Sequence, residues 1–351
     1  MLYNDRVSDD FKEKNMKKIH QTVAVFLAVL MLIACCAGCS SQKKQEQRVI
    51  GSCAGYDVLY EELRYVTMTY KDMFEATYGE GIWDDPTTAE QYRAELEETV
   101  WSIMLNNYAV LAACQAYGMQ LSDMEDEDIV AAVDRQIAEA VEVWGDEKLF
   151  AEELASMYMT EHLMRFVLTV AQMENELLYV LSSDLGIIEN DTNAFIDWLE
   201  QGNCVYVRHV FVSNDAGDDV AANRAAAESL RQRLTDADED EIAAIVKSAE
   251  NEELTYLNPY YIVRDVYSEA LENAAFSLAE VGDVSEVVET EDGFYVLLRV
   301  QDDPAVLLSN SVSLLSSYQW AKVEEIVESH REGLVIEKNE YGESIDLLAI
   351  Q

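Results

Sequence analysis

The side chains that most often perform chemistry in enzymes are scarce in this sequence of 351 residues. Its four histidines are His20, His162, His209 and His330, and no two of them stand three or four positions apart. A helix presents two imidazoles to one zinc ion only at such spacings. The sequence therefore predicts no helical zinc site, and we expect no metal or other cofactor.

Motifs for nucleophiles and phosphates are also missing. The sequence contains no G-x-S-x-G, no G-x-G-x-x-G and no P-loop pattern. Cys204 stands five positions before His209 in a strand-like run, so the two side chains are expected on opposite faces of that strand. Hydrolases with a Ser or Cys nucleophile and nucleotide-binding enzymes are therefore not indicated.

The charge balance excludes another class of partner. The chain has 24 Lys and Arg against 68 Asp and Glu, a formal net charge of −44. Because proteins bind phosphate backbones through clustered Lys and Arg, we expect no nucleic-acid partner. Half of the residues are hydrophobic, which is enough to bury a sizeable core and argues against wholesale disorder despite the charge.

Residues 1–39 have the organisation of an export signal. Two lysines follow Met16, which is a candidate for the true initiator, and an apolar run covers residues 23–34. That run suits the apolar part of a signal peptide but is shorter than the ~20 residues that cross a bilayer as a helix. A core helix is the alternative to a signal peptide.

The end of this segment resembles the lipobox of bacterial lipoproteins, in which a lipidated cysteine becomes the first mature residue. Two placements of the lipobox stay open. Residues 37–41 place small residues and serines around Cys39, which we favour, whereas residues 32–35 place an aliphatic residue before Cys35. The resemblance implies a lipid anchor in a bacterial cell membrane, with the protein on its extracytoplasmic side. The later Cys53, Cys114 and Cys204 are odd in number and widely spaced, which predicts buried or inert thiols rather than disulfides.

The first half of the exported chain is predicted to be helical. A short strand or hairpin is expected over residues 48–58. Apolar residues then recur every three or four positions, which indicates amphipathic helices. These are expected over residues 59–78 and 88–117, from a capping box at Ser122 and Glu125, and over 147–160 and 161–181. Together they predict a helical domain over residues 48–200.

The following segment mixes strands and helices, which is typical of an α+β fold. Strands are expected at residues 204–212 and 293–300. Helices are expected at residues 218–234, 238–249 and 267–277, with a loop at Pro259. Pro304 is interpreted as the end of this unit. A helix over 311–331 then follows, and residues 334–348 are expected to form strands.

Three stretches of the second half carry a family resemblance. They are residues 207–212, residues 270–278 with 282–285, and residues 290–297. In order and separation they resemble the first strand, the short helix with its turn, and the last strand of a parvulin-type peptidyl-prolyl isomerase. The likeness implies a parvulin-like α+β domain over residues 204–302.

The surrounding segments extend the resemblance to the PrsA-like and SurA-like extracytoplasmic foldase lipoproteins. In these proteins the helices before and after the parvulin unit form one chaperone domain. The resemblance therefore implies that residues 305–351, a returning C-terminal helix and strands, pack back on the helical domain. It also implies partners, namely unfolded or nascent secreted proteins and the membrane that holds the lipid anchor.

Position by position, the family's first catalytic His falls on His209. The second falls on Tyr295, and the reactive Cys or Asp falls near Glu250. The apolar positions that hold the proline ring fall on Tyr267, Leu271 and Phe276, of which the first two differ from the usual Met and Phe. Residues 256–260 replace a glycine-rich loop of the family, so that loop cannot follow the glycine-dependent path.

The chemistry implied needs neither a metal nor a nucleophile. Rotation of an X-Pro bond crosses a barrier of ~18–20 kcal/mol because amide resonance is lost. A site accelerates it by holding the ring and by favouring the twisted amide with polar groups, for which His209 and Tyr295 are the candidates. The leading hypothesis is a lipid-anchored prolyl isomerase that acts on secreted proteins. The alternative is a non-catalytic client-binding chaperone with a degenerate parvulin domain.

Overall fold

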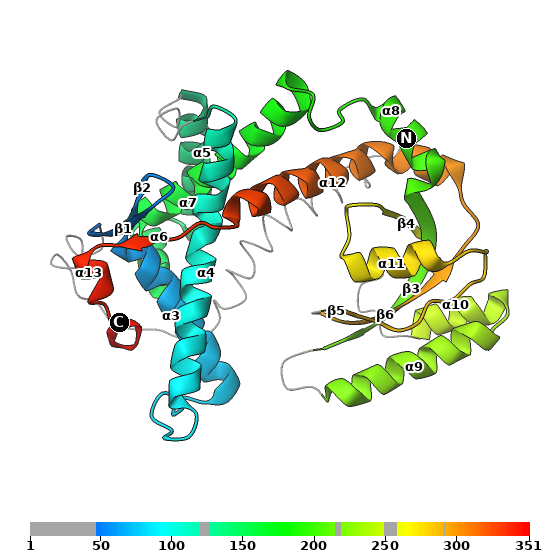
Figure 1. Ribbon diagram of the computed structural model, residues 1–351, viewed down its shortest axis with the longest axis horizontal. Coiled ribbons are helices and arrows are strands. Elements are labelled where there is room, and N and C mark those ends of the chain that lie inside the picture. Colours follow the sequence, from blue (N-terminus) through cyan, green and yellow to red (C-terminus); the bar gives the residue numbers. More distant parts are fainter. Residues whose placement is uncertain (1–46, 120–126, 215–218, 249–257, 291) are drawn as a thin grey trace. The chain divides into compact units, whose positions relative to one another are not determined.

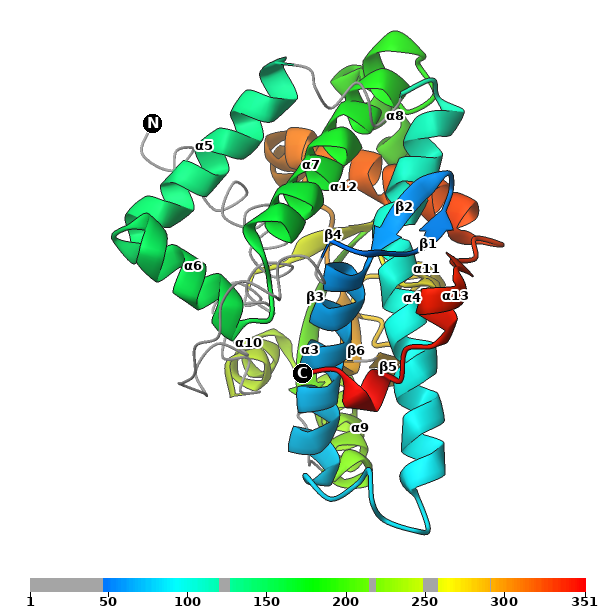
Figure 2. The same cartoon turned by 90° about the vertical axis from the view of Figure 1, so that its left-hand side faces the viewer.

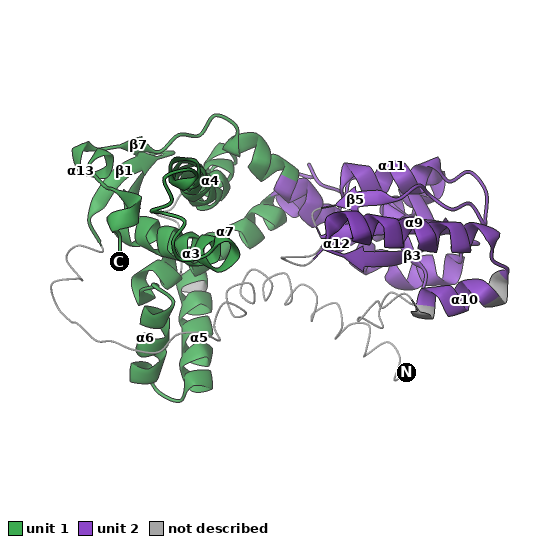
Figure 3. Ribbon diagram, turned by 90° about the horizontal axis from the view of Figure 1, so that it is seen from below, with its two compact units in different colours: residues 1–180, 325–351 green, residues 181–324 purple. Residues whose placement is uncertain are grey.

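The structure, a computed structural model, describes residues 47–119, 127–214, 219–248, 258–290 and 292–351. The chain divides into two compact units, coloured separately in Figure 3. Unit 1 comprises the described residues up to Val180 and Glu325–Gln351, and unit 2 comprises Leu181–Glu324. The first boundary between these units falls after Val180, and the predicted bounds of the domains stay predictions. Among the described residues, no helix combines the length and apolarity that a membrane crossing requires.

Unit 1 is built mainly from helices, with α3 and α4 side by side (Figures 1 and 2). The predicted helices are confirmed with small shifts at their ends. They are α3 (Tyr60–Tyr78), α4 (Ala89–Ala116), α5 (Glu127–Trp144), α6 (Glu147–Ser156) and α7 (Glu161–Tyr179). The Thr160 hydroxyl accepts the Leu163 N–H at 3.0 Å and so caps α7. The predicted capping box at Ser122 and Glu125 lies outside the described residues.

A small antiparallel sheet joins distant parts of unit 1. The predicted hairpin is confirmed as β1 (Val49–Cys53) and β2 (Tyr56–Leu59), and β7 (Glu337–Lys338) pairs with β1. The expectation of strands over residues 334–348 was wrong beyond β7. The Asn339 side chain accepts the N–H groups of Tyr341 and Gly342 at 3.0 and 2.9 Å. That cap starts the short helix α13 (Glu340–Glu343), so these residues are helical and do not extend a strand.

Unit 2 contains a four-stranded antiparallel sheet in the order β4-β3-β6-β5. The strands are β3 (Cys204–Ser213), β4 (Tyr260–Val263), β5 (Val288–Thr290) and β6 (Gly293–Arg299). Helices α9 (Val220–Asp236) and α10 (Glu239–Ser248) cover one face, and α11 (Glu269–Ser277) covers the other (Figure 1). The two longer strands were predicted, whereas β4 and β5 were not. The helical unit 1 and this sheet unit confirm the α+β class.

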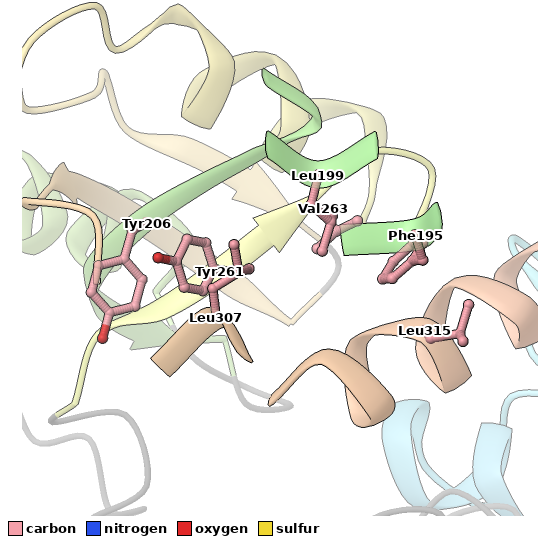
Figure 4. Close-up of a cluster of buried hydrophobic side chains, with 7 residues drawn as sticks. All are labelled: Phe195, Leu199, Tyr206, Tyr261, Val263, Leu307 and Leu315. Atoms are coloured by element: carbon pink, nitrogen blue, oxygen red, sulfur yellow. The ribbon is translucent and has the colours of Figure 1, made fainter. Parts of the chain in front are cut away.

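A cluster of buried side chains lies where the sheet of unit 2 meets α8 (Thr192–Trp198) and the first part of α12 (Pro304–Arg331), as Figure 4 shows. The rings of Tyr206 and Tyr261 stack with centroids 4.4 Å apart. The Tyr261 hydroxyl donates to the Asp303 carbonyl and accepts the Asp303 N–H, both at 3.0 Å. These bonds tie β4 to the residue that precedes α12.

The interpretation of Pro304 as the end of the α+β unit stays a prediction, whereas the expected start of the following helix at residue 311 was wrong. Pro304 is the first residue of α12, which therefore begins seven positions before the expected start at residue 311. The Asp303 carboxylate accepts the N–H groups of Ala305 and Val306 at 2.9 and 3.2 Å. Proline has no N–H to lose at a first helical position, and its fixed φ suits that position. Asp303 and Pro304 together start the helix.

Candidate active site

The strand register places the two polar candidates on one face of the sheet of unit 2. In the antiparallel pair of β3 and β6, His209 lies opposite Leu297 and Phe211 lies opposite Tyr295. Alternate residues of a strand share a face, so all four side chains project to the same side. This is the face that α11 covers. The ring centroids of His209 and Tyr295 are 5.4 Å apart.

His209 is almost fully enclosed, with 3% of its surface exposed. Its ring meets the edge of Tyr260 at a centroid distance of 5.3 Å. Burial disfavours the charged imidazolium and lowers the pKa of His209 to about 4. The side chain is therefore neutral near pH 7, where one ring nitrogen donates a hydrogen bond and the other accepts one.

Tyr295 is half-buried beside His209. Its ring also meets that of Phe211, with centroids 4.5 Å apart. Phe211 and Tyr260 were not predicted from the sequence as residues of the site. Phe211 could have been found by the two-residue period from His209, whereas Tyr260 lies on a strand that was not expected. We call His209, Phe211, Tyr260, Tyr267 and Tyr295 the aromatic cluster.

The three positions assigned to a proline ring lie around this face. Leu271 and Phe276 of α11 are partly buried against an apolar cluster of Val205, Val207, Ile262, Ala275, Leu278 and Leu297. The Arg264 guanidinium lies over the Phe276 ring, 3.7 Å from its centroid. Tyr267 is 36% exposed and lies 6.4 Å from Tyr260 between ring centroids.

The expectation that Tyr267 belongs to the short helix was wrong. Helix α11 begins at Glu269, and its N-cap is Ser268. The N–H of Tyr267 donates to a carboxylate oxygen of Glu272 at 3.0 Å. Tyr267 therefore belongs to the loop between β4 and α11. Its hydroxyl donates to the Tyr261 carbonyl at 3.4 Å.

Two residues hold the face in shape. Nη1 of Arg299 donates to the carbonyls of Leu278 and Ala279 at 2.6 and 3.1 Å, which fixes the end of α11 on the sheet. Gly293 starts β6 with φ near +149°. A Cβ there would lie 2.2 Å from the Val212 carbonyl oxygen, so only glycine allows β6 to approach β3 so closely.

The described residues give little support for a metal site or a reactive thiol. No three His, Cys, Asp or Glu side chains gather there as a possible metal group. Burial is the largest cause that raises the pKa of the thiols of Cys53, Cys114 and Cys204, to about 12 for Cys114 and about 11 for Cys204. These thiols stay protonated near pH 7. Glu250 and the two candidate lipidation sites, Cys39 and Cys35, lie outside the described residues.

Two families of known domains match the sequence. A SurA-like N-terminal domain matches residues 13–151, and a PPIC-type PPIASE domain matches residues 217–306. The second range includes Tyr295 and begins after β3, the strand that carries His209. A search of curated proteins gave no match.

Solved structures with some likeness include two described as PrsA and one described as SurA-like chaperones. The PrsA foldase of Streptococcus pneumoniae is 13% identical, with a TM-score of 0.35, and 81% of this chain and 93% of that chain are covered. The PrsA peptidylprolyl isomerase of Bacillus anthracis is 13% identical, with a TM-score of 0.34 and coverage of 64% and 94%. The structure from Campylobacter jejuni described as SurA-like chaperones is 12% identical, with a TM-score of 0.23 and coverage of 81% and 96%.

The family assignment rests on the two domain families, which match in the order that the sequence predicted. Their match confirms the resemblance to these families. Residues 270–278, 282–285 and 290–297 lie inside the matched PPIC-type range, whereas residues 207–212 lie before it. The chain therefore belongs with proteins that join a SurA-like N-terminal domain to a PPIC-type parvulin domain.

Proposed function

We propose that this protein is an exported, lipid-anchored foldase that accelerates cis/trans isomerisation of X-Pro bonds in secreted client proteins. The observation that carries the proposal is the pair of His209 and Tyr295, whose ring centroids lie 5.4 Å apart on the face that α11 covers. The match of residues 217–306 to the PPIC-type domain supports the same reaction.

The reaction follows from the polarity of this face. A planar amide resists rotation because its nitrogen lone pair is delocalised, and the twisted amide has a more basic nitrogen and an ordinary carbonyl. The neutral imidazole of His209 and the hydroxyl of Tyr295 are both able to donate and accept hydrogen bonds. Hydrogen bonds made better to the twisted amide than to the planar one lower the barrier. Leu271, Phe276 and Tyr267 supply the apolar surface for the proline ring.

The client and the anchor complete the proposal. The SurA-like N-terminal domain supports contact with unfolded or nascent secreted chains. The anchor is a lipid on Cys39, with Cys35 as the alternative, which holds the protein on the extracytoplasmic side of a bacterial membrane. Mass spectrometry of the protein extracted from membranes tests this part. A diacylated peptide that begins at Cys39 is expected, and an unmodified terminus would contradict the anchor.

The isomerisation rate of a short X-Pro peptide tests the reaction. The full chain is expected to accelerate exchange between cis and trans, and His209→Ala is expected to remove most of the acceleration. His330→Ala, a histidine substitution in unit 1, is the matched control and should keep the wild-type rate. Absence of acceleration by folded wild-type protein would contradict the catalytic claim.

A second candidate function is client binding without catalysis. It is favoured by Tyr295, which stands where the parvulin resemblance implies a second His, and by the near-complete enclosure of His209. In this case the protein suppresses aggregation of an unfolded client while leaving the exchange rate of the X-Pro peptide at its uncatalysed value. The two measurements together separate the two functions.

A further inference from the structure

The loop between β4 and α11 is held by one carboxylate. Oε1 of Glu272 accepts the N–H of Val266 at 2.9 Å and the N–H of Tyr267 at 3.0 Å. Glu272 belongs to α11 and is half-buried. A single oxygen thus fixes two successive peptide groups of the loop.

These bonds are not an ordinary helix cap. The N–H groups that lack partners in a helix are those of its first turn, after the N-cap. The N-cap of α11 is Ser268, whose side chain makes no capping hydrogen bond, and the two N–H groups bound by Glu272 come before it. The carboxylate therefore anchors the loop rather than the helix.

The rest of the loop is tied to neighbouring elements of unit 2. The N–H of Arg264 donates to the Asn203 carbonyl at 3.1 Å. Asp265 has φ near +61°, a left-handed conformation that few residues other than glycine adopt, and its carboxylate pairs with Lys322 at 3.0 Å. Such a path depends on contacts with other elements, and Glu272 supplies two of them, at the backbone N–H groups of Val266 and Tyr267.

Tyr267 is the residue whose position depends on this anchor. Its ring lies 6.4 Å from that of Tyr260, and Tyr260 contacts His209 at 5.3 Å between centroids. Tyr267 is also the only one of the three proposed proline-binding residues that lies outside α11. Its place in the aromatic cluster therefore comes from the loop, together with the bond of its hydroxyl to the Tyr261 carbonyl, and not from the packing of a helix on the sheet.

We propose that Glu272 is a positioning residue, whose carboxylate holds the loop of residues 264–268 so that Tyr267 contributes to the binding of the client's proline. The inference rests on the proposed function of the aromatic cluster. It assigns Glu272 to substrate binding and leaves rotation of the amide to His209 and Tyr295. Loss of the carboxylate should therefore raise KM for an X-Pro peptide with little change in kcat, because the interaction with the ring is the same in the planar and twisted states.

A double-mutant cycle on the full chain tests this role. Glu272→Ala is expected to raise KM about tenfold, equivalent to about 1.4 kcal/mol. Glu272→Gln keeps an oxygen that accepts both N–H groups and should stay within about threefold of wild type. Glu269→Ala removes an exposed acid from the first turn of the same helix and is the matched control. In a Tyr267→Ala background, Glu272→Ala should change KM less than about twofold.

Three results of this cycle would overturn the assignment. An equal rise in KM in both backgrounds would make Glu272 a general structural residue, and so would an equal effect of Glu269→Ala or a failure of Glu272→Gln to restore binding. Wild-type protein that binds the peptide without accelerating its exchange would contradict the proposed isomerase alone. The same cycle read as peptide Kd by NMR titration then tests Glu272. Wild-type protein that does not bind the peptide would contradict both.

Discussion

The hydroxyl of Tyr108 donates to the carboxylate of Glu62, 2.8 Å from Oε2, inside unit 1. Glu62 is 6% exposed, and the N–H of Leu59 also donates to it at 2.9 Å. Its neighbour Glu61 is also buried. One carboxylate oxygen of Glu61 lies 2.5 Å from the Thr160 hydroxyl, and the other lies 2.5 Å from Nδ1 of His162. Two adjacent acids of α3 thus connect this helix to α4 and to the start of α7.

This burial makes unit 1 sensitive to pH. Burial raises the pKa of Glu62 to about 7, an effect that the hydrogen bonds from Leu59 and Tyr108 oppose. Because the folded pKa lies above the unfolded value near 4.5, the contribution to stability is complete below pH 4.5 and is lost as pH rises through 7. The loss is about 3 kcal/mol for a shift of this size.

Glu62→Gln should remove this dependence. Urea unfolding of unit 1, followed by hydrogen exchange at amides of α3 and α4, should show stability that falls from pH 4.5 to 7 in wild type and a flatter profile in the variant. Glu90→Gln changes an exposed acid of α4 and should keep the wild-type profile. A wild-type profile in Glu62→Gln would show that the buried acid is not the cause.

Unit 2 should respond to pH with the opposite sign. Burial lowers the pKa of His209 to about 4, below its unfolded value near 6.5. Its contribution to stability is therefore present above pH 6.5 and is lost as pH falls through 4, by about 3 kcal/mol in total. Hydrogen exchange at amides of β3 and β6 should show this loss, and His209→Gln, which carries no charge at any pH, should abolish it. Stability that is constant between pH 4 and 6.5 would contradict the burial of His209.

Gly293 should tolerate no side chain. Gly293→Ala places a Cβ 2.2 Å from the Val212 carbonyl oxygen at φ near +149°, and we expect a loss of more than about 3 kcal/mol of unfolding free energy. The matched control is Gly282→Ala. Gly282 has φ near +96° and no atom within 4 Å of the position that a Cβ would take, so the cost should be about 1 kcal/mol. Equal losses of unfolding free energy in the two variants, measured by thermal or urea unfolding, would contradict a steric clash at Gly293.

The helices and strands that were predicted are those long enough to show a clear pattern of apolar residues in the sequence. Helices α3, α4 and α7 carry apolar residues every three or four positions, and β3 and β6 are rich in β-branched and aromatic residues. Strands β4 and β5 have four and three residues and were missed. They form because the outer edges of β3 and β6 offer backbone N–H and C=O groups that need partners, and a local sequence pattern does not report such neighbours.

The candidate site was predicted only in part for a related reason. His209 and Tyr295 came from aligned stretches, and the register then explains why they share a face. Tyr260 was not found, because its place beside His209 depends on the pairing of β4 with β3. Tyr267 was assigned to a helix because its apolar ring fits the spacing of Leu271 and Phe276. The hydrogen bonds of Glu272 to the preceding N–H groups place it in a loop.

The most direct test of the account is the rate of cis/trans exchange of a short X-Pro peptide with the full chain and with His209→Ala and Tyr295→Phe. We predict acceleration by wild type and a loss of at least about tenfold in each variant, because each removes a hydrogen bond that favours the twisted amide. The acceleration should be constant from pH 6 to 8, where His209 is neutral. Full activity in both variants, or no acceleration by folded wild-type protein, would contradict the central claim that this pair catalyses rotation of the prolyl bond.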